Sequence, residues 1–376
     1  MQKKSFSKWV LKNRINLIIL IVSLVSTLCV IEFVNYLFME ENSYVWPPNL
    51  DRVFLPNSNV VYGVEGDSHF TINKLGYRGP LIKDKEKEYR ILTVGGSTTE
   101  CLYLDDQETW PYLIMKKLGA TYDGREVIVM NIGKSGHNTR DHILQLKYLI
   151  KEYEPDLIIA MVGANDMLLK LSKRWVWKPF NESSYDPTKT FYNSPEYSWR
   201  ETLTYKFFEF LYFKFYLKLE PQDLAGENYI EPRLERKNAA IKIDEVPDLV
   251  PVLEDYENNL DRLIEIAKEN NVTMLFATQP YLWKRRMSDE EDSALWMTTD
   301  FNGNFYETEV MIKSMDKFND RLLEVCPKNK DVLCFDLERK VPKSLEFFYD
   351  DMHFNEKGAE LVAGEFAKFI SSRIFD

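Results

Sequence analysis

The sequence predicts an α/β protein in which a doubly wound, three-layer αβα domain follows one N-terminal membrane helix. From Tyr89 onward, short β-branched runs alternate with amphipathic segments, and this alternation is typical of a parallel sheet covered by helices on both faces. Several of the runs end in glycine followed by polar residues, and a long apolar run precedes them all. The 376 residues, 45% of them hydrophobic, are enough for a large core.

The apolar run covers residues 17–31 and continues with interruptions to Met39, which is long enough to cross a bilayer. We expect an uncleaved anchor through residues 15–38, because the run is long for the alternative, a cleaved signal peptide, and no small-residue cleavage site follows it. Acidic Glu40 and Glu41 end the run, whereas its start is preceded by Lys3, Lys4, Lys8, Lys12 and Arg14. This asymmetry predicts a cytoplasmic N-terminus and an extracytoplasmic remainder.

Composition excludes some classes of partner and cofactor. The formal net charge of −11 argues against nucleic acid, because phosphate binding needs a basic surface. The four cysteines show no zinc-type spacing, and we expect neither a metal nor another cofactor. Cys326 and Cys334 bracket a short polar loop, so both a disulfide and two free thiols remain open.

The doubly wound domain is expected to contain five parallel strands with crossover helices. The strands are predicted at residues 91–94, 127–131, 157–162, 272–278 and 332–335. Apolar residues at helical spacing predict helices behind Asp141, across residues 253–267 and 311–322, and from about 356 to 370.

These patterns divide the chain into three parts. Residues 1–40 form a tail and anchor, 41–88 a juxtamembrane lobe of small strands and turns, and 89–376 the α/β domain. An insertion at about 168–250 interrupts that domain and contains an aromatic segment at 205–217, which is too short to span a bilayer. We expect this segment to cap the domain or to rest on the membrane surface.

Ser97 is the candidate nucleophile. It follows the first predicted strand across Gly95 and Gly96, which allow the backbone to turn sharply. Open α/β sheets place their reacting groups at the carboxyl ends of the strands, where this serine is expected.

Three later stretches supply complementary groups at the same sheet edge. The second strand runs into Gly133 and Gly136, whose backbone amides can face the site. Asn165 follows the third strand and can donate from its amide to a developing oxyanion. Asp350 and His353 lie three residues apart before the last helix, so that a carboxylate can orient an imidazole that activates the serine.

These four stretches, in this order, resemble the blocks of the SGNH, or GDSL-type, hydrolase superfamily. The resemblance covers residue 89 to the C-terminus without the insertion and implies a flavodoxin-like fold. It implies Ser97 as nucleophile, His353 as base and Asp350 as its orienter. It also implies an oxyanion hole made by the backbone amides of Ser97 and Gly136 and the side chain of Asn165.

Gly136 matches the glycine block better than Gly133, because it follows a small residue after the strand end. Gly96 stands where the family motif has aspartate, which is not a triad member. Asp351 is the rival to Asp350, but the three-residue spacing fits only Asp350.

Four other polar residues have both structural and functional interpretations. We expect a surface role for His137, although it could line the site, and structural roles for His69 and His142. Arg78 is expected to be a structural arginine in a turn, with a substrate-side cation as the alternative.

The resulting expectation is a membrane-anchored serine esterase that forms an acyl-enzyme on Ser97 and releases it to water. Its substrate would be an O-acyl glycan or a lipid-like acyl ester. The alternatives are an O-acyltransferase that passes the acyl group to a sugar hydroxyl, and a catalytically silent binding protein. The aromatic insertion, including Phe210 and Phe213, is expected above the active-site edge, where it would admit the substrate.

Overall fold

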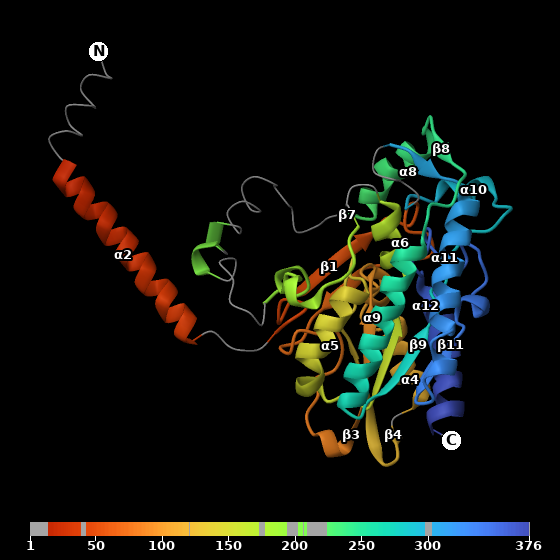
Figure 1. The fold of residues 1–376 in the computed structure, drawn as a ribbon, viewed down its shortest axis with the longest axis horizontal. Coiled ribbons are helices and arrows are strands. Elements are labelled where there is room, and N and C mark those ends of the chain that lie inside the picture. Colours follow the sequence, from red (N-terminus) through yellow and green to blue (C-terminus); the bar gives the residue numbers. More distant parts are fainter. Residues whose placement is uncertain are drawn as a thin grey trace. The chain divides into compact units, whose positions relative to one another are not determined.

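The computed structural model describes residues 14–38, 43–119, 121–172, 177–193, 202–205, 207–208, 224–297 and 303–375. The chain divides into two compact units, one made of residues 1–42 and 194–220, the other of 43–193 and 221–376. The second unit contains the sheet and all candidate site residues (Figure 1).

The first unit contains helix α2, Arg14–Phe38. Its segment Arg14–Val34 has a mean hydropathy of 2.8 and is long and apolar enough to span a membrane, as a signal sequence near the N-terminus also is. Within this unit Glu32 accepts a 2.7 Å hydrogen bond from the backbone N–H of Thr204. Most of the predicted aromatic segment 205–217, including Phe210 and Phe213, lies outside the described residues.

The central sheet has the strand order β11-β9-β6-β3-β5-β4. Five strands are parallel, and their bounds are β3 Glu88–Gly95, β5 Arg125–Asn131, β6 Leu157–Met161, β9 Thr273–Ala277 and β11 Val332–Phe335. They are the five predicted strands, each end within three residues of its expected position, and the α/β prediction is confirmed.

A sixth strand, β4 at Thr121–Tyr122, was not expected from the sequence and pairs antiparallel with β5 at the sheet edge. It forms because Asp123 and Gly124 both adopt positive φ, 49° and 73°, as a tight two-residue hairpin turn requires.

The strand order places the carboxyl end of β3 at a topological switch point. After β3 the chain forms β5 on one side of it and then crosses to form β6 on the other side. Connections that leave in opposite directions open a crevice at this edge, where doubly wound proteins bind their ligands. Ser97 directly follows β3 and therefore lies at the mouth of the crevice.

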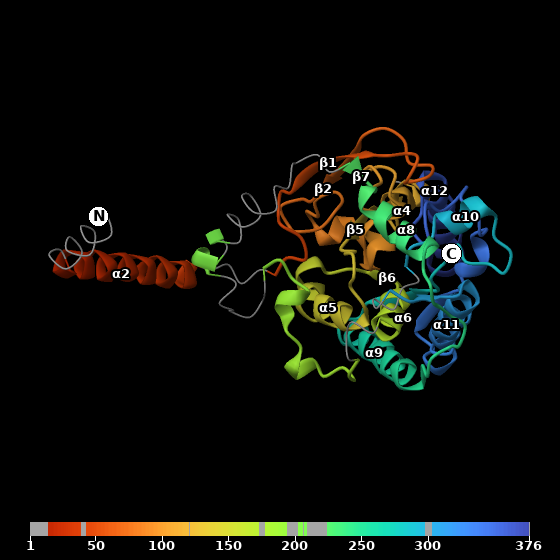
Figure 2. The same ribbon diagram turned by 90° about the horizontal axis from the view of Figure 1, so that it is seen from above.

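Helices cover both faces of the sheet, as the alternation predicts. α4, Trp110–Leu118, packs with α12, Glu356–Ile370, on one face of the sheet. Figure 2 shows this pair on the opposite side of the sheet from the three other long helices of this unit. Those three pack together as α5 Thr139–Tyr153, α9 Val250–Glu269 and α11 Thr308–Leu323.

The remaining elements lie around the crevice edge and in the lobe before β3. Two small sheets combine β1 Asp51–Pro56 with β2 Ser68–Thr71 and β7 Leu224–Ala225, and β8 Lys242–Ile243 with β10 Phe305–Tyr306. The short helices are α3 Ser97–Glu100, α6 Ala164–Leu171, α8 Ile230–Lys237 and α10 Asp289–Ser293. α6 ends at Leu171, so the chain is helical across the expected start of the insertion at about residue 168.

The structure resolves the open question about the cysteines. Cys326 and Cys334 form a disulfide with a Cα–Cα distance of 5.9 Å. Cys101 is a buried free thiol, and Cys29 is exposed on α2.

Candidate active site

Ser97 is the first residue of α3, directly after the turn at Gly96. The N–H groups of Thr99 and Glu100 both donate to the Gly96 carbonyl, which closes the turn between strand and helix. The serine is left partly exposed at the end of β3. Its Oγ lies 2.7 Å from Nε2 of His353, a residue 256 positions later in the chain.

His353 and Asp350 belong to one tight turn before α12. The Asp350 carboxylate accepts backbone hydrogen bonds from Met352 and His353, at 3.0 and 2.9 Å, which fold the chain back on itself. In this turn His353 Nδ1 lies 2.7 Å from Oδ2 and 2.9 Å from Oδ1 of Asp350. The structure therefore brings Ser97, His353 and Asp350 into one hydrogen-bonded line.

Burial and charge act in opposite directions on this pair. Burial raises the pKa of Asp350. The neighbouring His353 and the hydrogen bonds that the carboxylate accepts lower this pKa by more than burial raises it, so the net pKa is depressed. Burial lowers the pKa of His353, but the Asp350 charge and hydrogen bond outweigh it, so its net pKa is raised. The carboxylate thus favours protonation of the imidazole, which is what a general base beside a serine needs.

Asp351, the rival carboxylate, faces another set of donors. Its Oδ1 accepts from Trp283 Nε1 at 2.8 Å, and its Oδ2 accepts from the N–H groups of Trp296 and Met297 at 2.7 and 3.1 Å. These bonds attach the chain at residues 283–297 to the turn before α12. Within the described chain, no hydrogen bond joins the Asp351 side chain to the histidine.

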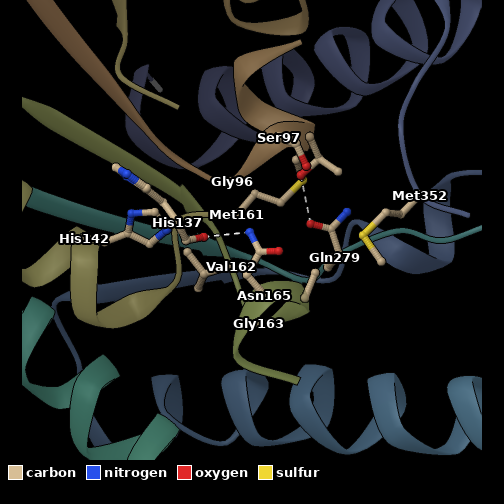
Figure 3. A pocket seen from close by; sticks show the side chains of 12 residues that line it. Gly96, Ser97, His137, His142, Met161, Val162, Gly163, Asn165, Gln279 and Met352 are labelled. Atoms are coloured by element: carbon tan, nitrogen blue, oxygen red, sulfur yellow. Dashed lines mark hydrogen bonds between the residues drawn. The ribbon is translucent and has the colours of Figure 1, made fainter. Parts of the chain in front are cut away.

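Asn165 lies against the turn that presents Ser97. Its Nδ2 donates a 2.7 Å hydrogen bond to the carbonyl of His137, which uses one of two amide hydrogens and fixes the other. A Cβ on Gly96 would lie only 2.4 Å from this Nδ2, so the close approach requires glycine at position 96. Figure 3 shows the Asn165 amide and Ser97 at the same cavity.

The cavity beside Ser97 is small. Its volume is about 10 Å³, room for roughly one water molecule. Its lining comes from the carboxyl ends of β3, β6 and β9 and from the turns after β5 and before α12, and includes Ser97, His137, Asn165, Gln279 and Met352. The predicted convergence of polar groups at one sheet edge is therefore the arrangement found.

The Gly136 amide is not among the groups that line this cavity; the next residue, His137, is. Gly136 adopts φ of +80° in the exposed turn after β5. Gly133, the other glycine of this block, donates its N–H to Asn131 Oδ1 at 2.8 Å. Within the described chain, neither Ser97 nor Gly136 donates its backbone N–H to a protein group.

Glu100 connects the Ser97 helix to the Gly136 turn. Its buried carboxylate accepts a hydrogen bond from the hydroxyl of Ser135, the residue before Gly136. Burial raises the pKa of Glu100 to about 7, although the Ser135 hydrogen bonds and the Arg78 charge oppose the rise. This group therefore titrates near neutral pH at a position that holds two candidate oxyanion donors together.

The surface role predicted for His137 is wrong. Its ring is buried against α5, with Nδ1 3.1 Å from Gln145 Nε2, and burial lowers its pKa to about 3, so the ring is neutral. His142 also lines the cavity and pairs with Gln145, whereas His69 is exposed beside Asp105.

Arg78 has the structural role that the sequence favoured. Its buried guanidinium donates to the backbone carbonyls of Glu100, Cys101, His69 and Leu104 and pairs with Asp106 at 2.5 Å. It thereby fixes the chain that follows α3.

Sequence reasoning missed three residues around the candidate triad. Gln279 directly follows the fourth strand and accepts a 3.1 Å hydrogen bond from Thr98, so its place at the strand end was the available signal. Trp296 donates from Nε1 to Asp350 Oδ2 at 2.8 Å. Tyr229 stacks on Trp296 with ring centroids 5.1 Å apart. Tyr229 ends a single 3₁₀ turn at Glu227–Tyr229 and Trp296 lies on irregular chain, so no periodicity indicates either residue.

Two curated proteins are similar in sequence to parts of this chain. A stretch of 79 residues is 30% identical to an arylesterase of Vibrio mimicus and covers 21% of this chain and 38% of that protein. A stretch of 88 residues is 30% identical to esterase TesA of Pseudomonas aeruginosa and covers 23% of this chain and 43% of that protein. The chain thus spans less than half the length of these curated relatives.

Solved structures with a similar chain path include the psychrotrophic esterase EstA from Pseudoalteromonas, at 12% identity and a TM-score of 0.41 over 77% of this chain and all of that one. Another is the acetylxylan esterase Axe2 from Geobacillus stearothermophilus, at 15% identity and a TM-score of 0.40 over 75% and 94%. At these scores the likenesses carry no further weight.

A family sequence profile matches a longer part of the chain. Residues 93–361, well over half of the chain, match that of the GDSL-like Lipase/Acylhydrolase family, and the matched range runs from β3 into α12 and includes all four polar blocks. The chain belongs to the GDSL-like lipase/acylhydrolase family.

Proposed function

We propose that this protein is a membrane-anchored serine esterase that cleaves its ester substrate through an acyl-enzyme on Ser97. The observation that carries the proposal is the line of contacts from Ser97 Oγ through the His353 ring to the Asp350 carboxylate, at 2.7 Å for each of the two steps. A serine hydroxyl is a weak nucleophile until a neighbouring base takes its proton, and this line supplies the base and its orienter.

In the first half-reaction His353 Nε2 takes the hydroxyl proton while Ser97 Oγ attacks the carbonyl carbon of the ester. Asp350 keeps the proton of Nδ1 facing its carboxylate, so that Nε2 is the free acceptor. The tetrahedral intermediate collapses, and its alcohol leaves with the proton from His353. In the second half-reaction His353 takes a proton from a water, which attacks the acyl-serine carbonyl. The second tetrahedral intermediate then collapses to the free acid, and His353 returns the proton to Ser97 Oγ.

The negative oxygen of each intermediate needs donors placed before the reaction. The free hydrogen of the Asn165 amide is one proposed donor, because the hydrogen bond to His137 holds the amide against the Ser97 turn. The backbone N–H groups of Ser97 and Gly136 are the other two proposed donors; that of Gly136 lies in the exposed turn beside the cavity and outside its lining. Losing one such donor typically costs about 10² to 10³ in turnover.

The names of the relatives support an ester substrate, and an O-acyl glycan and a lipid-like acyl ester are the two classes that we propose. Water is the proposed acceptor. Transfer to a sugar hydroxyl uses the same acyl-enzyme, and product analysis with and without an added sugar acceptor distinguishes the two.

The decisive experiment is fluorophosphonate labelling combined with hydrolysis of p-nitrophenyl acetate. We expect wild type to be labelled and active, Ser97→Ala to lose both label and activity, and His353→Ala to lose activity, each with little change in melting temperature. A folded wild-type protein that is neither labelled nor active would favour a silent binding protein instead.

For the anchor, we propose that α2 stays uncleaved with its N-terminus in the cytoplasm and the catalytic unit outside. The basic residues before the helix support this orientation, and the Cys326–Cys334 disulfide suits an oxidising compartment. Protease added to spheroplasts should digest the catalytic unit. Protection until the inner membrane is lysed would reverse the orientation, and a mature protein that begins after α2 would identify a signal peptide.

A further inference from the structure

The cavity beside Ser97 is too small to enclose the longer part of an ester. At about 10 Å³ it holds roughly one water-sized group. A second pocket, of about 670 Å³, lies in the same unit and falls within the range of about 300–1,000 Å³ typical of ligand pockets. Chain segments outside the common strand–helix repeat build most of it, since α8, β10 and the chain around residue 296 contribute its walls.

One helical spacing and one hydrogen bond place this large pocket next to the candidate triad. Leu168, in its wall, is three residues after Asn165 on α6, so both side chains lie on one side of that helix. Trp296 forms another part of the wall, and its Nε1 donates the 2.8 Å hydrogen bond to Asp350 Oδ2. The pocket therefore begins one helical turn from the proposed oxyanion donor and one hydrogen bond from the carboxylate.

The lining selects for an uncharged, apolar ligand. Its walls are mostly hydrophobic and include Leu168, Pro232, Ala239, Trp296, Met297 and Phe305. Among the described residues of the lining, only Glu235 is formally charged, and its carboxylate disfavours an anionic group. Next to lining residues in the chain, Leu234 and Ile241 are 52% and 58% exposed, so apolar surface continues outside the pocket.

We propose that this pocket binds an alkyl chain of the ester substrate, with Trp296 as the wall that it shares with the triad. The inference rests on the esterase function proposed above and narrows it to the lipid-like class of esters. The chain is the acyl part or the alcohol part of the ester, and two substrate series distinguish these sources.

The test compares rates along a p-nitrophenyl ester series from acetate to decanoate with rates along an alkyl acetate series from methyl to octyl. If the acyl chain occupies the pocket, kcat/KM of wild type rises along the first series by up to about fourfold per methylene, the gain from burying one CH₂ group. If the alcohol chain occupies it, the rise appears in the second series.

Two pocket variants act in opposite directions. Ala239→Phe fills the pocket and should lower the decanoate-to-acetate ratio of kcat/KM at least tenfold, or the octyl-to-methyl ratio if the alcohol binds there. Leu168→Ala enlarges it and should move the preferred chain length upward. The matched control is Leu234→Phe, at an exposed position on α8 outside the lining, which should leave the ratios unchanged.

A binding measurement separates the pocket from the catalysis. In the Ser97→Ala background, 1-decanol should raise the melting temperature, and the added Ala239→Phe change should abolish that rise. Binding without any esterase activity in wild type would reject the proposed function and keep the pocket. Active enzyme whose chain-length ratios do not differ between Ala239→Phe and Leu234→Phe would overturn the inference.

Discussion

Asp350 and Asp351 are adjacent and both fully buried, yet their carboxylates face different partners. Asp350 pairs with the ring of His353 at 2.7 Å, whereas Asp351 accepts from Trp283, Trp296 and Met297. One carboxylate therefore reaches the histidine, and the other holds the chain at residues 283–297 to the turn before α12.

Asparagine at each position should therefore have a different effect. Asp350→Asn should lower kcat by up to about 10⁴, because the amide no longer fixes the histidine tautomer, yet less than Ser97→Ala or His353→Ala. In Asp351→Asn the side-chain NH₂ replaces one of the oxygens that accept from Trp283, Trp296 and Met297, so that a donor meets a donor. This should lower the free energy of unfolding by about 1–3 kcal/mol, with a much smaller loss of kcat. Kinetics and chemical denaturation of both variants decide the assignment. A crippled Asp351→Asn beside a fully active Asp350→Asn would make Asp351 the orienter.

The acidic limb of the pH profile should report the raised pKa of His353. Burial lowers this pKa, but the Asp350 carboxylate outweighs burial, so kcat/KM should fall on acidification with a midpoint above the ordinary value of 6.5. The Asp350→Asn variant loses the carboxylate that raises the pKa of His353 most. Burial still lowers this pKa, and only the more distant charges of Asp351 and Glu100 still raise it, so the midpoint should move to lower pH. p-Nitrophenyl acetate rates across the pH range measure it. An identical midpoint in both proteins would contradict the assignment.

Gly96→Ala should act through Asn165. The added Cβ would lie 2.4 Å from Asn165 Nδ2 and must displace the amide. We expect a loss of turnover of about 10² to 10³, similar to that of Asn165→Ala, and a double variant no worse than either single one, because both remove the same donor. Gly364→Ala on α12 is the control, since the nearest atom to its Cβ, Lys117 Cε, is 4.0 Å away. Additive losses in the double variant would mean that Gly96 acts independently of Asn165.

Glu100 should make stability depend on pH around neutrality. Its folded-state pKa of about 7 lies above the ordinary 4.5, so its contribution is fully present below about pH 4.5 and is lost as pH rises to about 7. Glu100→Gln stays neutral throughout. The melting temperature of this variant relative to wild type should therefore rise between pH 4.5 and 7 and level off above. A difference that is constant across this range would show that Glu100 does not titrate there.

The sequence by itself determined the α/β class, the five parallel strands and the periodic helices, because alternation and helical spacing are local properties of the chain. It also indicated the candidate site residues, since Ser97 and Asn165 come shortly after strands whose carboxyl ends share one sheet edge. The spacing of Asp350 and His353 is likewise local, because a single turn closes between them.

Only the tertiary structure decided which distant groups meet. The Ser97–His353 contact, the burial of His137, the cysteine pairing and the edge strand β4 each depend on packing or on a backbone turn that periodicity does not register. Trp296 lies on irregular chain and Tyr229 on a single 3₁₀ turn, both far in sequence from the four polar blocks. No local pattern indicates that Trp296 donates to Asp350 or that Tyr229 stacks on Trp296. The large pocket has the same origin, because a concave surface forms from segments that are remote in sequence and exists only once the chain has packed.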